Sequence, residues 1–190
     1  WDTAGVISTW GTPGRKHHIP GQDATIARRL KQAGAILLGK TNTPEFTLSF
    51  DTQSPLHGAT KNPHDLKRTP GGSSGGAGAL IASGGTPFDI GTDYGGSVRV
   101  PCHFCGIAGI KPTSGSVPRT GMCLPPGGLR DFQSHVGPMA RYAQDLELVL
   151  AVIWGPDRFD TWIADVPLRR SQELSLKGLK CLVMEQFGST

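Results

Sequence analysis

Two segments rich in glycine and serine constrain this 190-residue sequence more than any other feature. The first, PGGSSGGAGAL, covers Pro70–Leu80, and the second, GTDYGGSVRVP, covers Gly91–Pro101. Glycine has no Cβ, so the backbone can turn sharply there and direct several N–H groups at one point. Each segment can therefore form a backbone anion site with a serine hydroxyl beside it.

The second segment has the residue order expected of an oxyanion hole. Tyr94, Gly95, Gly96 and Ser97 would supply consecutive backbone N–H groups just before a helix that we expect to begin at Val98. The positive end of that helix would add to the same field. One such donor is typically worth about 3–4 kcal/mol of transition-state stabilisation. Serine is a weak nucleophile, so Ser97 would also need a base.

Composition and spacing leave three interpretations of these segments open. They can be plain glycine turns, a loop that binds phosphate or another anion, or a site for acyl transfer. The nucleotide-binding form of the second interpretation is weakened, because no G-x-x-x-x-G-K-[ST] is present and Gly76-Ala-Gly78 lacks the third glycine of a dinucleotide fingerprint.

Hydrophobic periodicity predicts an α/β fold. Short apolar runs alternate with amphipathic stretches, which favours a mixed or mostly parallel β-sheet core flanked by α-helices. The expected helices cover 26–33, 98–105 and 145–154, and the expected strands cover 35–38, 87–90 and 107–110.

The overall composition excludes several classes of protein. The net charge of +4 comes from scattered basic residues, so we expect no direct contact with nucleic acid. No apolar run is long enough for a membrane segment, and the first residues lack the charged region followed by an apolar one that is typical of a signal peptide.

The four cysteines indicate buried free thiols, which suit a reducing, cytoplasmic location. No second Cys or His pair follows Cys102-x-x-Cys105 at ligand spacing, so we expect no metal and no cofactor.

Further motifs lie around the two segments in a fixed order, and together they resemble the amidase signature family of hydrolases. The resemblance runs from about Asp2 to Gly155. It includes Gly39-Lys-Thr-Asn-Thr-Pro-Glu45, Asn62-Pro, Arg68-Thr-Pro70, Phe104-Cys-Gly106, Gly109-Ile-Lys-Pro-Thr113 and Gly137-Pro138. It implies the amidase signature fold, incomplete in this chain, with residues 1–190 a partial domain whose signature core covers about 39–113.

The resemblance also implies a catalytic triad of serine, cis-serine and lysine. Ser97 would be the nucleophile, and Ser73 would be the bridging serine on a cis peptide bond, steadied by Ser74. In such a triad the bridging hydroxyl relays a proton from the nucleophile to a neutral lysine. Asp93 and Arg99 match positions that hold the loop in shape, and we interpret them as a structural brace.

The lysine of this triad is expected outside the chain. In the family it lies in a V-K-D or I-K-D stretch shortly before a segment like Asp2–Gly5, which would place it upstream of Trp1. Lys40 and Lys111 belong to other family segments. We therefore expect residues 1–190 to lack the N-terminal part with this lysine and a C-terminal part. Alone, they should be inactive and should expose a strand edge and an apolar face.

The function implied is hydrolysis of a carbon–nitrogen bond in a small-molecule linear amide through an acyl-enzyme on Ser97. A homodimer of the full-length protein is a further expectation. Two alternatives stay open: the A subunit of a glutamine-dependent tRNA amidotransferase, and a non-catalytic module that binds a carboxylate or phosphate.

Overall fold

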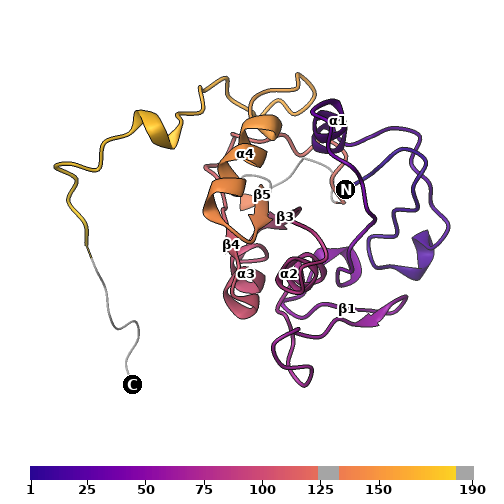
Figure 1. Ribbon diagram of the computed structural model, residues 1–190. Helices are drawn as coiled ribbons and strands as arrows, with labels where there is room; N and C mark the ends of the chain where they lie inside the picture. The colour runs from indigo at the N-terminus through magenta and orange to yellow at the C-terminus, as the bar shows by residue number, and fades with distance from the viewer. Residues whose placement is uncertain (124–132, 183–190) are drawn as a thin grey trace.

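A small β-sheet between two pairs of helices forms the centre of the molecule (Figure 1). The computed structural model describes residues 1–123 and 133–182. The sheet has the strand order β3-β5-β4, with β3 at Phe88–Asp93, β5 at His135–Ala140 and β4 at Ala108–Gly109. The helices are α1 at Thr25–Gln32, α2 at Gly75–Ala82, α3 at Arg99–Cys105 and α4 at Ala143–Ile153.

Smaller elements connect these parts. A short hairpin pairs β1 at Gln53–Ser54 with β2 at Gly58–Ala59, and it lies near α2. The 3-10 helices are η1 at Pro13–Arg15, η2 at Glu45–Thr47 and η4 at Ser171–Glu173. None of the helices in the described part of the chain is both long and apolar enough to cross a bilayer.

Alternation along β5 divides the core into two clusters, because successive side chains of a strand point to opposite faces. Val136 packs with residues of α1 and α4, such as Ile26 and Ile153. Met139 packs with residues of α2 and α3, including Ile81. The sheet is therefore covered on both faces, and α2 and α3, which carry the glycine-rich segments, share one face.

The strand pairing of the described residues shows only the antiparallel part of the mixed sheet that the sequence predicts, and none of the parallel pairing. The α/β class with flanking helices is confirmed, but both described pairings, β3 with β5 and β4 with β5, are antiparallel. Sequence periodicity shows which segments are strands, but strand direction depends on how the connections between them cross, which the pattern does not contain.

The other expected elements are confirmed except for one strand. Helices at 26–33, 98–105 and 145–154 match α1, α3 and α4, and strands at 87–90 and 107–110 match β3 and β4. The strand expected at 35–38 is wrong, since this run has no strand partner in the described ranges and Ile36 is 83% exposed. An apolar run predicts burial, but a strand also needs a neighbour.

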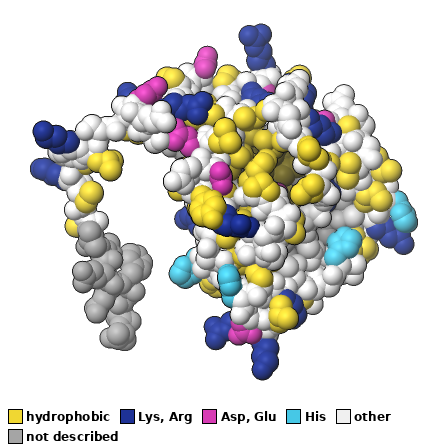
Figure 2. All heavy atoms as spheres, in the orientation of Figure 1, with side chains coloured by type: hydrophobic (Ala, Val, Ile, Leu, Met, Phe, Trp, Pro, Cys, Tyr) yellow, Lys and Arg dark blue, Asp and Glu magenta, His cyan; other side chains and the backbone are white. Residues whose placement is uncertain are grey.

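This exposed run borders an apolar hollow of about 770 Å³. Figure 2 shows hydrophobic side chains gathered around it, near α1 and the N-terminus. The outer edge of β3 forms another wall. There, the Ile90 carbonyl accepts a hydrogen bond from Trp1 Nε1 at 3.2 Å, and the Ile90 N–H donates to Asp89 Oδ1 at 2.7 Å. The outer edge of β3 therefore has no strand partner among the described residues, and side chains bond to the backbone of Ile90 there.

Cysteine burial follows the sequence-based expectation at three of the four positions. Cys102, Cys105 and Cys123 are buried free thiols, whereas Cys181 is exposed. Burial raises the pKa of Cys102 to about 12 and the pKa of Cys105 to about 11. These two thiols are therefore protonated at neutral pH and unsuited to nucleophilic or metal chemistry.

Gly137 in β5 offers a test of the sheet packing. A Cβ at this position would lie 2.0 Å from the Ile110 carbonyl oxygen, so Gly137→Ala must displace backbone. We expect the free energy of unfolding, measured by urea titration, to fall by about 3 kcal/mol.

Gly39→Ala is the matched control, because nothing lies within 4 Å of its added Cβ. We expect its stability to stay within about 0.5 kcal/mol of the parent. Equal stability of the two variants would contradict the packing described here.

Candidate active site

The two glycine-rich segments meet at their serines. The backbone N–H of Ser74 donates a hydrogen bond to the Ser97 carbonyl oxygen at 3.1 Å. Ser74 lies just before α2, and Ser97 lies just before α3. Ser73 and Ser97 are 1% and 8% exposed, and the peptide bond between Gly72 and Ser73 is cis. The structure therefore brings together the two serines that the sequence singles out, and it has the cis bond that the resemblance implies.

Close backbone approach explains the glycines at this junction. A Cβ at Gly72 would lie 2.8 Å from the Ser49 carbonyl oxygen, and one at Gly76 would lie 2.3 Å from the Asn42 carbonyl oxygen. On the β3 side, a Cβ at Gly91 would lie 2.6 Å from Ser74 Oγ. A side chain at Gly91 would push the two glycine-rich segments apart, and one at Gly72 or Gly76 would push the first segment away from the backbone of residues 49–50 or 42.

Asp93 organises the loop that carries Ser97. Its side chain is fully buried and accepts backbone N–H bonds from Gly96 at 2.9 Å, Val98 at 3.1 Å and Arg99 at 3.2 Å. The Arg99 guanidinium adds two more, at 3.0 and 2.8 Å. Burial raises the pKa of Asp93, but these hydrogen bonds more than offset that effect and hold it below its usual value. This geometry supports the interpretation of Asp93 and Arg99 as a brace.

The backbone donors of the expected oxyanion hole are not all available. The Gly96 N–H is already bonded to Asp93, so its expected role in the hole is not supported by this geometry. Within residues 1–123 and 133–182, the N–H groups of Tyr94, Gly95 and Ser97 have no acceptor. Sequence order shows four consecutive donors, but it cannot show which of them the neighbouring carboxylate takes.

No lysine reaches the two serines in the described part of the chain. Lys40 Nζ donates to the Trp1 carbonyl and to Thr3 Oγ1, and Lys111 Nζ donates to the Pro112 carbonyl at 3.1 Å. The hydroxyls of Ser73 and Ser97 have no hydrogen-bond partner among the same residues. The described residues also hold no group of three or more His, Cys, Asp or Glu that could bind a metal ion.

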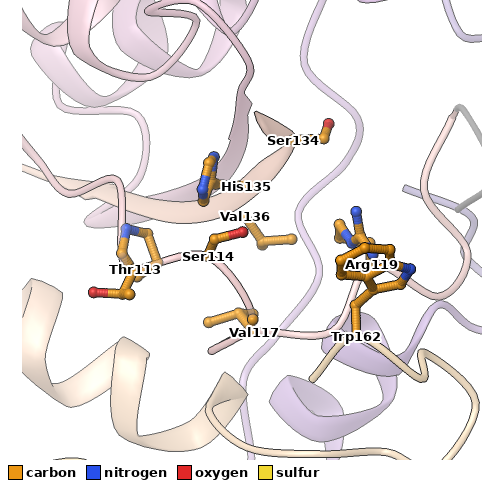
Figure 3. A pocket seen from close by; sticks show the side chains of 10 residues that line it. Thr113, Ser114, Val117, Arg119, Ser134, His135, Val136 and Trp162 are labelled. Atoms are coloured by element: carbon orange, nitrogen blue, oxygen red, sulfur yellow. The ribbon is translucent and has the colours of Figure 1, made fainter. Parts of the chain in front are cut away.

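One neighbour of the site escaped the sequence analysis. His135 Nδ1 lies 3.2 Å from the Asp93 carbonyl oxygen, at the point where β5 pairs with β3. Figure 3 shows His135 beside a small cavity that Val117, Arg119 and Trp162 also line. At about 10 Å³ this cavity has room for one water at most, so it is no substrate pocket. Nothing in the spacing of His135 from Asp93 signals the contact, which depends on strand register.

Asp93 gives a prediction that depends on pH. Asp93→Asn removes the charge that Arg99 and three N–H groups bind, and we expect it to lower the free energy of unfolding by about 3 kcal/mol near neutral pH. Because the pKa of Asp93 is below its usual 3.8, the carboxylate stabilises the fold fully above about pH 4 and loses its effect as pH falls further. The difference between parent and variant should therefore shrink toward about pH 3.

Asp65→Asn is the control for this experiment, since Asp65 pairs with Arg68 on the exposed surface. Urea titrations should show a loss below about 1 kcal/mol for this variant. A loss for Asp93→Asn that is equally small, or that grows at acidic pH, would show that Asp93 is not the centre of the loop.

Comparison with known proteins places this geometry in a family. The family model "Amidase" matches residues 1–190. The chain is 43% identical over 191 residues to the A subunit of the glutamyl-tRNA(Gln) amidotransferase of Moorella thermoacetica, covering 98% of this chain. It is 40% identical over 187 residues to the protein of the same name from Methanococcoides burtonii, covering 97% of this chain.

Similar solved structures point to the same family. The A subunit of the glutamyl-tRNA(Gln) amidotransferase of Thermotoga maritima superposes with a TM-score of 0.81 at 33% identity, over 87% of this chain and 36% of that one. A 6-aminohexanoate cyclic dimer hydrolase complexed with its substrate gives 0.80 at 37% identity, over 88% and 35% of the two chains. The chain spans 38% of the length of each of the two curated relatives described above. It belongs to the amidase family.

Proposed function

We propose that this segment carries the nucleophile of an enzyme that hydrolyses the carbon–nitrogen bond of a small-molecule linear amide. The observation that carries the proposal is the meeting of Ser73 and Ser97, both buried, across the hydrogen bond from Ser74 N–H to Ser97 O. Structural relatives that include a peptide amidase and an aryl acylamidase support this class of reaction.

The proposed reaction has two halves. Ser97 Oγ attacks the amide carbonyl carbon, its proton passes to the Ser73 hydroxyl, and the Ser73 proton passes to a neutral lysine. The oxyanion that forms is held by the N–H groups of Tyr94, Gly95 and Ser97. When the carbon–nitrogen bond breaks, Ser73 returns a proton to the leaving amine, and water then hydrolyses the ester on Ser97.

The lysine of this scheme is proposed to come from a part of the protein other than residues 1–190. Lys40 and Lys111 are both bound elsewhere, and neither touches a serine of the site. Residues 1–190 would then be a partial amidase signature domain, with the core at 39–113, and would be inactive alone. The proposed location is the cytoplasm, where the three buried thiols stay reduced, and the full-length protein is proposed to form a homodimer.

A second candidate is the A subunit of a glutamine-dependent tRNA amidotransferase. The curated relatives at 40 and 43% identity carry that name. The same serine chemistry would release ammonia from glutamine, and a partner protein would hold the charged tRNA. Hydrolysis of glutamine that depends on a partner would distinguish this function from a general amidase, whereas ligand binding without turnover would indicate a non-catalytic anion-binding module.

A serine-directed fluorophosphonate probe tests the proposal. We expect the longest natural form of the protein that contains residues 1–190 to be labelled at Ser97, as found by peptide mapping, and the 190-residue chain not to be labelled. Ser97→Ala should abolish labelling, and Ser73→Ala should slow it by about a hundredfold, because the proton relay is lost.

Ser83→Ala is the control, since Ser83 is an exposed serine at the other end of α2. Its labelling rate should equal that of the parent. Labelling that persists in Ser97→Ala would contradict the assignment of the nucleophile. If neither form is labelled while both are folded, the anion-binding module becomes the better account.

A further inference from the structure

The first N–H of α2, the helix that follows the bridging serine, is bonded by a residue that is distant in the sequence. Serine is a favoured N-cap residue because its hydroxyl can accept the free N–H groups of the first turn. Ser74 occupies the N-cap of α2, yet its side chain makes no capping hydrogen bond. The N–H of Gly75, the first residue of the helix, donates to Thr52 Oγ1 at 3.0 Å. A hydroxyl 23 residues earlier in the chain therefore satisfies the first donor of this helix.

The same hydroxyl also closes the other end of the serine segment. Thr52 Oγ1 donates its proton to the Gly71 carbonyl oxygen at 2.8 Å while it accepts the Gly75 N–H. A threonine hydroxyl has one proton to donate and lone pairs to accept, so both bonds can form together. One fully buried side chain thus bridges the two ends of Gly71–Gly75, the segment that contains Ser73 and Ser74.

Thr52 and Gly75 fit each other closely. A Cβ at position 75 would lie 2.3 Å from Thr52 Oγ1, so glycine is needed there for the hydroxyl to reach the backbone. The backbone of Thr52 is fixed in turn, because its carbonyl accepts the Thr60 N–H at 2.9 Å beside the β1–β2 hairpin. The hairpin therefore holds the part of the backbone that carries the Thr52 hydroxyl.

We propose that Thr52 is a positioning residue that holds Gly71–Gly75 in place, and with it Ser73 and Ser74, for the reaction. The inference rests on the proposed function. In the structure Ser74 Oγ packs against Gly91, next to the loop of Ser97, so the segment that Thr52 holds lies directly against the loop of the proposed nucleophile.

The test compares two substitutions in the longest natural form of the protein. Thr52→Val keeps the shape and removes both hydrogen bonds, whereas Thr52→Ser keeps the hydroxyl. The fluorophosphonate probe gives the maximal labelling rate and the probe's apparent affinity separately. We expect Thr52→Val to lower the maximal rate about tenfold or more with the affinity within about threefold, and Thr52→Ser to stay within about threefold of the parent in both.

Thr25→Val is the matched control. Thr25 is also buried and loses a side-chain hydrogen bond, to Asp157, but it lies on α1 away from the serines. It should lower the melting temperature and leave the maximal labelling rate unchanged. If Thr52→Val does not melt cooperatively, Thr52→Cys replaces it, because a thiol keeps the size and weakens both bonds, and the rate should again fall.

Three results would overturn the positioning role. These are an unchanged labelling rate in a folded Thr52→Val or Thr52→Cys, a rate in Thr52→Ser as low as in Thr52→Val, and an equal loss of rate in Thr25→Val. Absence of labelling at Ser97 in the parent would remove the proposed function itself, and the role of Thr52 with it.

Discussion

The buried carboxylate of Asp93 is the interaction on which the rest of the site depends. A charge in the interior is tolerated only when it is paired and hydrogen-bonded, and Asp93 receives five hydrogen bonds, from Gly96, Val98 and Arg99. Those bonds turn the chain from β3 into α3 and determine where Ser97 lies. They also engage one of the four donors that the sequence offers, so the loop that positions the proposed nucleophile uses one N–H group of the proposed oxyanion hole.

The sheet determines how the two serine segments face each other. Because α2 and α3 pack on the same face of β5, the loops that precede these helices meet at one point, and Ser74 bonds to Ser97 there. The serine hydroxyls are left without partners inside the described part of the chain. Side-chain hydroxyls and backbone N–H groups that lie together without partners are typical of a site prepared for a group that arrives from outside.

Local patterns predicted the two serine-containing segments, and hydrophobic periodicity predicted three of the described α-helices, since each depends on residues close together in the sequence. The roles of the serines and of the Asp93–Arg99 brace follow from the family resemblance. Long-range pairing could not be predicted in this way. The apolar run at 35–38 has the composition of a strand but no strand partner among the described residues, and His135 reaches Asp93 only through strand register. Thr52 was missed for the same reason, because its contacts with Gly71 and Gly75 join segments about 20 residues apart, and a lone threonine carries no signal.

Gly91 and Gly137 face each other across β3 and β5, and both positions exclude a side chain, but for different reasons. At Gly91 the obstacles are the side chains of Ser74 and Val98, whereas at Gly137 the nearest obstacle is the carbonyl oxygen of Ile110. Evolution can replace a side chain, but every residue has a carbonyl. Over long divergence Gly137 should therefore stay glycine in any sequence that keeps this sheet, while Gly91 is tied to glycine only for as long as side chains such as those of Ser74 and Val98 are kept beside it.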